Sequence, residues 1–200
     1  MSFHPQMPYG TPQWHRSERV LADEGPPFAF TPENRQKLEE IASHYPPERR
    51  VSAVLPALYL VQEQQTHLTG NAMAHVAEVI GCSRAHVEDV ASYYVMFFTK
   101  PVGKYVLQVC RTLACALNGA EHVTAELCRQ LGVAPGGTDA AGEFTVMEME
   151  CLGACDRAPV VMVNNEHWHE CQSPEAIQAL IRDLREKGVA ALTGCHHTKE

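Results

Sequence analysis

The chain has 200 residues and a formal net charge of −8, from 16 Lys and Arg against 24 Asp and Glu. This length suits one or two compact domains. The acidity is spread evenly, with −4 in residues 1–98 and −4 in residues 99–200, so we expect no nucleic-acid partner. The longest apolar run, about residues 51–61, contains Pro56 and is too short for a bilayer, so we expect no direct membrane insertion.

The N-terminal segment, residues 1–26, has several prolines and no apolar periodicity, which predicts an extended arm without a fold of its own. It lacks the apolar core of a secretory signal and the acid-free, Arg-rich character of a transit peptide. We therefore expect a bacterial-type cytoplasm with reduced thiols.

Residues 27–98 have the apolar spacing of a small helical bundle. The first helix is expected to begin after Thr31, a capping residue followed by Pro32, and to end before Tyr45. Three further helices are predicted over residues 49–65 with a kink at Pro56, residues 72–80 closed by Gly81, and residues 86–97 capped by Ser83. Four aromatic side chains at the end of the last helix are expected to fill the bundle: Tyr93, Tyr94, Phe97 and Phe98.

Residues 99–188 change to a mixed pattern that predicts an α/β sandwich. Short, β-branched or alternating segments predict strands over 104–109, 144–150 and 159–164. Apolar residues at helical spacing predict helices over 118–131 and 173–187, each followed by a glycine. The sequence therefore predicts an α+β fold, in which the helical bundle precedes the sandwich and residues 189–200 form a tail.

Two close cysteine pairs follow two of the predicted strands. Cys110 and Cys115 have four residues between them, and Cys151 and Cys155 have three. Neighbouring strands of one sheet would bring both loops to the same edge. Four converging thiolates can hold a [2Fe-2S] cluster, and the small residues between Cys151 and Cys155 leave room for backbone amides to donate to the sulfurs. The spacing favours iron–sulfur over structural zinc only modestly, so a zinc-binding module stays open at this point.

The other four cysteines have no partner at ligand spacing. We expect Cys82, Cys128 and Cys171 to be structural, while Cys195 lies in the tail. His167 and His169 lack further ligands at fixed spacing, as does the Cys195-His196-His197 segment. The chain has no C-x-x-C pair for thiol oxidoreduction and no G-x-G-x-x-G after a strand for a dinucleotide.

The cysteine loops, with their neighbours, resemble a known family. The sequence around Cys110 and Cys115, followed by Glu148-x-Glu150-Cys151-Leu152-Gly153-Ala154-Cys155-Asp156, is similar to the thioredoxin-like [2Fe-2S] subunit of NADH:quinone oxidoreductase, respiratory complex I. In bacteria this protein is the E subunit of the complex. The resemblance runs from about residue 28 to residue 188 and includes Pro101-Val102-Gly103-Lys104 at the junction. It departs at residues 167–171 and in the C-terminal tail.

The resemblance implies a fold, a cofactor and a function. It implies a thioredoxin-like domain that holds one [2Fe-2S] cluster through four ligands: Cys110, Cys115, Cys151 and Cys155. FMN and NADH are expected only on a partner flavoprotein, with which the cluster exchanges single electrons. A neighbouring iron–sulfur subunit is a second expected partner. The chain is then part of an oxidoreductase, and the isolated chain is not expected to turn over substrate.

The resemblance also implies a location, on the cytoplasmic side of the bacterial inner membrane and bound there through the complex. The alternative assembly is a soluble NAD-linked hydrogenase or formate dehydrogenase, whose corresponding subunit is similar in both domains.

All-cysteine ligation points to a reduction potential of roughly −400 mV, and nearby acids such as Glu148, Glu150 and Asp156 should disfavour reduction.

Overall fold

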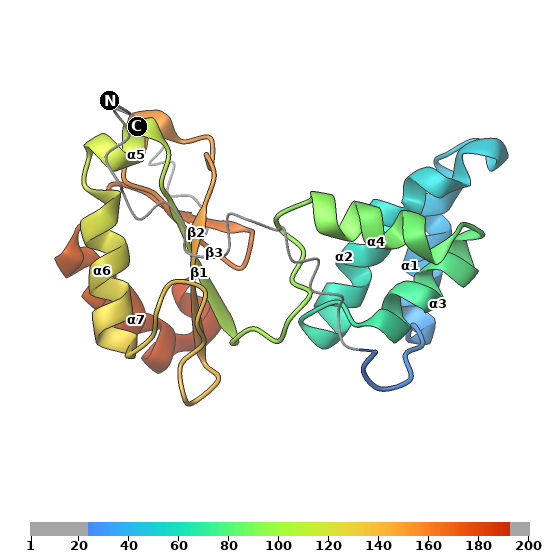
Figure 1. Ribbon diagram of the computed structural model, residues 1–200, viewed down its shortest axis with the longest axis horizontal. Coiled ribbons are helices and arrows are strands. Elements are labelled where there is room, and N and C mark those ends of the chain that lie inside the picture. The colour runs from blue at the N-terminus through green and yellow to red at the C-terminus, as the bar shows by residue number, and fades with distance from the viewer. Residues whose placement is uncertain (1–23, 193–200) are drawn as a thin grey trace, which may run out of the picture. The chain divides into compact units, whose positions relative to one another are not determined.

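The computed structural model describes residues 24–192. These residues form two compact units that divide between Pro101 and Val102. The first unit is helical, and the second combines a four-stranded sheet with helices (Figure 1), which confirms the predicted fold class. Most of the predicted arm and tail lies outside the described residues. The limits 27–98 and 99–188 remain our proposal for the two domains.

The helical unit contains four α-helices and one 3-10 helix within the described residues. Their bounds are α1 Pro32–Ser43, η1 Pro47–Ala53, α2 Val54–Gln65, α3 Gly70–Ile80 and α4 Arg84–Tyr93. Thr31 and Ser83 cap α1 and α4 as predicted, because each side chain accepts a hydrogen bond from a first-turn backbone N–H. Gly81 ends α3 in the left-handed conformation, which glycine adopts without strain.

The predicted helix over residues 49–65 is confirmed from Val54 to Gln65, but its predicted start at residue 49 is wrong. Residues 47–53 are instead a 3-10 helix, and α2 begins at Val54. Pro56 therefore lies in the first turn of α2, where its missing N–H has no partner inside the helix to lose.

The predicted helix over residues 86–97 is also too long, because α4 ends at Tyr93. The Gln62 side chain of α2 accepts from the Phe98 N–H at 2.8 Å and donates to the Met96 carbonyl at 2.9 Å. This clamp turns the chain so that Phe97 and Phe98 are buried, whereas Tyr93 remains 78% exposed. Only part of the aromatic group therefore fills the bundle.

The second unit is built on a sheet with the strand order β2-β1-β3-β4. The strands are β1 Tyr105–Cys110, β2 Phe144–Met149, β3 Val161–Val163 and β4 His167–His169. β1 pairs with β2 in parallel and with β3 antiparallel, and β3 pairs antiparallel with β4. The first three strands match the predicted segments to within two residues, and β4 was not predicted.

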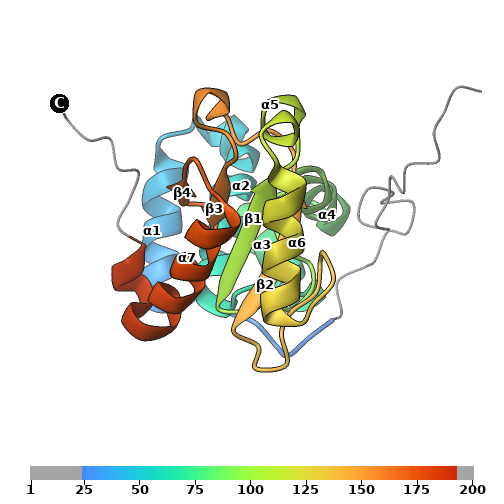
Figure 2. The same cartoon turned by 90° about the vertical axis from the view of Figure 1, so that its left-hand side faces the viewer.

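Three α-helices belong to this unit within the described residues: α5 Leu113–Leu117, α6 Ala120–Leu131 and α7 Pro174–Lys187. Helices α6 and α7 lie side by side against one face of the sheet, as Figures 1 and 2 show. Leu107 and Val109 of β1 are buried beneath apolar residues of these helices, among them Leu127 and Ile181. A 3-10 helix, Gly188–Ala191, follows α7.

The predicted helix over residues 118–131 is confirmed by α6, whereas the short α5 before it was not predicted. Gly119 has φ +88°, and this break in the helical conformation separates the short α5 from the longer α6. The break leaves α5 free to carry Cys115 at the edge of the sheet. No helix within residues 24–192 combines the length and the apolar character needed to cross a membrane.

Gly103 lies close to the backbone at the start of β2. A methyl group at position 103 would lie 2.8 Å from the Glu143 carbonyl carbon and 2.8 Å from the Phe144 nitrogen. We expect Gly103→Ala to lower the free energy of unfolding by about 1–3 kcal/mol, because the backbone must shift to admit it. Denaturant unfolding measures the change. Glu186→Ala, on the exposed surface of α7, is the control, and equal stabilities of the two variants would contradict the steric argument.

Candidate metal centre

The sheet brings the two cysteine pairs to one edge. Cys110 is the last residue of β1 and lies opposite Met149, the last residue of the parallel strand β2. Cys115 follows on α5, Cys151 lies in the loop after β2, and Cys155 begins the 3-10 helix Cys155–Arg157 that ends this loop. Figure 1 shows α5 and this loop at the same end of the unit. The convergence expected from neighbouring strands is therefore present in the structure.

The two thiols of each pair contact each other, and hydrogen bonds from Leu152 and Thr112 link the two loops. Cys151 Sγ lies 3.6 Å from Cys155 Sγ, and the Cys110 thiol is hydrogen-bonded to the Cys115 thiol. The Leu152 backbone N–H donates to Cys110, so the second loop reaches the first pair. The Thr112 hydroxyl lies 3.3 Å from Cys110 Sγ and also bonds to the Cys151 thiol.

The two pairs differ in burial. Cys110 and Cys115 are 2% and 1% exposed, whereas Cys151 and Cys155 are exposed at the surface. Among the described residues, no three His, Cys, Asp or Glu side chains are grouped as ligands of a single metal ion. The sulfurs are instead arranged as two pairs, and a [2Fe-2S] cluster takes four cysteine ligands. The donor set therefore fits such a cluster.

Two of these thiols have a lowered pKa. Burial raises the pKa of Cys110, but hydrogen bonds from the Thr112 hydroxyl and from the Thr112 and Leu152 backbones outweigh it, and the net pKa is lowered. The Gly153 backbone N–H, 3.4 Å from Cys151 Sγ, is the main cause of the lowered pKa of Cys151. A lower pKa favours the thiolate, which is the form that binds metal.

The pKa of the other thiol in each pair is raised. Burial is the main cause at Cys115, with its hydrogen bond to Cys110 second, and together they raise the pKa of Cys115 to about 11. The hydrogen bond with Cys151 is the main cause of the raised pKa of Cys155, and the charges of Cys151 and Cys110 add to it. Each pair of thiols therefore tends to keep one proton, because two neighbouring thiolates repel each other. A positive metal centre between the sulfurs would remove this repulsion.

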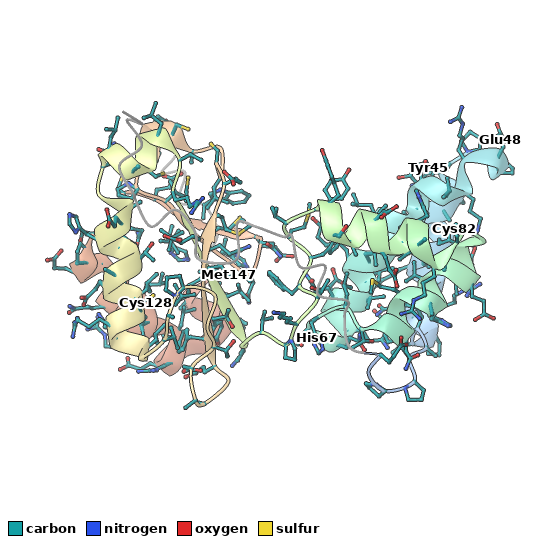
Figure 3. The ribbon with its side chains drawn as sticks, in the orientation of Figure 1. Tyr45, Glu48, His67, Cys82, Cys128 and Met147 are labelled. Carbon is teal, nitrogen blue, oxygen red and sulfur yellow. The ribbon has the colours of Figure 1, made fainter. Side chains whose placement is uncertain are left out.

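The remaining cysteines lie apart from this group. Cys82 and Cys128 are half-buried, in the helical unit and on α6 (Figure 3), and burial is the main cause of the raised pKa of each thiol. Cys171 is exposed, with φ +50°. Contrary to our expectation of a structural cysteine, its side chain is not buried in a core. Cys195 lies outside the described residues.

Two residues of the site were missed in the sequence. Thr112 lies between the first two cysteines, and its spacing was a usable signal for a hydroxyl near the sulfurs. Trp168 of β4 donates from its indole Nε1 to the Leu152 carbonyl at 3.0 Å. That contact depends on the pairing of β4 with β3, and no local pattern indicates it.

The acidic side chains near the cysteines differ in the ion pairs that they form. The Glu148 carboxylate lies 3.7 Å from the guanidinium of Arg111, which directly follows Cys110. Asp156 and Glu170 flank Arg157 at 3.8 and 3.9 Å. Glu150 is exposed immediately before Cys151. Arginines therefore offset part of the negative charge that the sequence places around this edge.

Comparison with known proteins identifies the family. Residues 38–185 match the family model described as thioredoxin-like [2Fe-2S] ferredoxin. NADH-quinone oxidoreductase subunit 2 of Thermus thermophilus is 39% identical over 158 residues, which are 79% of this chain and 87% of that protein. An E subunit of NADH-quinone oxidoreductase from Rhizobium meliloti is 36% identical over 151 residues, which are 76% of this chain and 88% of that protein.

A solved structure shares the fold. A chain of an NAD⁺-reducing [NiFe]-hydrogenase superposes with a TM-score of 0.58 and 22% identity, over 67% of this chain and 23% of the hydrogenase chain. This likeness concerns the fold alone. The family model and the two relatives confirm the resemblance seen around the cysteine loops. The chain belongs to the thioredoxin-like [2Fe-2S] ferredoxin family, to which E subunits of NADH-quinone oxidoreductase belong.

Proposed function

We propose that this chain is the iron–sulfur electron-transfer subunit of an NADH:quinone oxidoreductase. Its cluster would exchange single electrons with the FMN of a partner flavoprotein that oxidises NADH. The observation that carries the proposal is the convergence of four thiols at one sheet edge: Cys110, Cys115, Cys151 and Cys155. Membership in a family with E subunits of this enzyme supports the same assignment.

The proposed ligands form a site that suits electron transfer. When bound, a [2Fe-2S] cluster accepts and returns one electron at a time. The buried thiols of Cys110 and Cys115 anchor it on the sheet side, and backbone N–H groups of Leu152 and Gly153 donate to the sulfurs. Exposed Cys151 and Cys155 leave one side at the surface, which keeps the path to a partner's redox group short.

An apolar surface beside the cysteines is suited to contact with that partner. Leu113 and Leu117, one turn apart on α5, are 75% and 78% exposed and flank Cys115. In the helical unit, Tyr93, Tyr94 and Val95 also expose apolar surface at the end of α4. Exposed apolar groups of this kind favour protein contacts. We propose that the flavoprotein, and beyond it a neighbouring iron–sulfur subunit, bind the chain on the cytoplasmic side of the bacterial inner membrane.

The cluster itself is tested by purifying the full chain without oxygen. We expect about two iron and two acid-labile sulfide per chain, a visible charge-transfer spectrum and an EPR signal after reduction. Zinc without sulfide in the purified chain would overturn the proposal and favour the structural zinc module.

The Glu148 carboxylate should lower the potential of the proposed cluster. Glu148→Gln removes a negative charge and leaves the positive charge of Arg111 next to Cys110. We expect the midpoint potential to rise, on the order of tens of millivolts, because reduction adds negative charge to the cluster. EPR-monitored titration measures it. Glu186→Gln at the far end of α7 is the control, and an unchanged or lower potential in Glu148→Gln alone would reject this role.

A further inference from the structure

The peptide group between Leu152 and Gly153 is hydrogen-bonded at both ends. Its carbonyl oxygen accepts from Trp168 Nε1 at 3.0 Å, and its N–H donates to Cys151 Sγ at 3.4 Å. This peptide is trans, since the cis bond of the described residues precedes Pro159. In a planar trans peptide the C=O and the N–H point in opposite directions. A bond that fixes the carbonyl therefore also aims the N–H.

Packing and backbone conformation fix both Trp168 and the peptide group that it contacts. Trp168 is the central residue of β4, lies opposite Met162 of β3, and packs against the core of the second unit. Leu152 packs against the same core. Gly153 has φ +85°, a conformation that side-chain-bearing residues rarely adopt, and this turn directs its N–H back to the sulfur.

We propose that Trp168 is a positioning residue that aims the Gly153 N–H at Cys151 and so raises the reduction potential of the cluster. The inference rests on the proposed function, because it assumes a cluster bound at Cys151. Reduction places more negative charge on the cluster and its sulfurs, so a donor to the sulfur stabilises the reduced form more than the oxidised form. The indole bond to the carbonyl also polarises the peptide, which strengthens its N–H as a donor.

The first test is Trp168→Phe, which keeps a flat aromatic ring at position 168 and removes the donor. We expect the equilibrium constant for one-electron reduction to fall about fivefold, the effect of one hydrogen bond, with altered g-values of the reduced cluster. Iron and sulfide content should stay near the wild-type level. A cluster-loaded variant with the wild-type potential and EPR spectrum would overturn the inference.

A second replacement tests the same bond with less change in shape. β-(3-Benzothienyl)alanine has the bicyclic ring of tryptophan with sulfur in place of the N–H. It can be incorporated at position 168 alone in a Trp14→Phe background, because the chain has two tryptophans. The same background with ordinary tryptophan at 168 is the matched control. A lowered potential with the cluster retained supports the positioning role, whereas an unchanged potential, or loss of the cluster, rejects it.

The two proposals fail in different ways. A wild-type chain that binds no iron and sulfide overturns the proposed function, and with it the premise of this inference. A wild-type chain that carries the cluster, with both replacements at position 168 leaving its potential unchanged, overturns the role of Trp168 alone.

Discussion

Replacement of any one of the four proposed ligands by alanine is expected to abolish stable cluster binding. Each iron of a [2Fe-2S] cluster with four cysteine ligands takes two thiolates, so one missing sulfur leaves an iron incompletely bound. We expect iron content to fall by more than about tenfold, since even residues that only support metal ligands change affinity 10–100-fold. The four variants are Cys110→Ala, Cys115→Ala, Cys151→Ala and Cys155→Ala, and iron and sulfide analysis with visible spectroscopy measures the loss.

Matched cysteine variants outside the site control for general effects. Cys128→Ala removes a half-buried thiol from the same unit, and Cys82→Ala removes one from the helical unit. Cys195→Ala changes the predicted tail. All three should keep the wild-type iron content, and circular dichroism should show that the ligand variants remain folded. Equal iron retention across ligand and control variants would sink the ligand assignment.

Reduction by NADH is expected only when the flavoprotein is present. NADH delivers two electrons as a hydride, whereas the proposed cluster accepts one, so a flavin must receive the pair and pass the electrons on singly. The isolated chain should show no bleaching of its visible spectrum with NADH over the time in which the complex is fully reduced. Dithionite reduction of the isolated chain shows that its cluster is competent. Rapid reduction by NADH with no flavin detectable would contradict this division of labour.

The exposed leucines of α5 allow a sharper form of this experiment. Leu117→Gln should slow reduction in the complex, because it removes apolar surface beside Cys115, while dithionite reduction is unchanged. Val189→Gln is the matched control. Val189 is 73% exposed in the same unit, but it follows Gly188 near Tyr105, which is at the opposite end of β1 from Cys110. Equal rates in the two variants would reject contact through α5.

The strands and their cysteine loops were predictable because their signals are local. The segment before Cys110 is β-branched and apolar, and the segment before Cys151 alternates, so each strand end was visible in the sequence. The spacing of the cysteines indicated a metal centre but favoured iron–sulfur over zinc only modestly. The family resemblance rested on the same residues and is confirmed by the family model.

The missed features depend on contacts between distant segments. The early end of α4 follows from the Gln62 clamp on residues 96–98, which are more than thirty positions away. Helix α5 was not predicted because it is only five residues long, and Gly119, with its positive φ, separates it from α6. β4 is three residues long and pairs only with β3, so Trp168 reaches Leu152 through a tertiary contact that no periodicity reports.

The placement of the cysteines at the ends of two parallel strands has a consequence for the stability of the sheet. Cys110 and Cys151 meet only because β1 pairs with β2, and the intervening chain includes all of α6. A cluster bound to both loops is a covalent cross-link between these strands, and it closes a long loop that is otherwise held by strand pairing and packing. Since a cluster binds the folded chain and not the unfolded one, loading shifts the unfolding equilibrium toward the native state. The supply of iron would then affect the stability of the folded chain as well as its capacity for electron transfer.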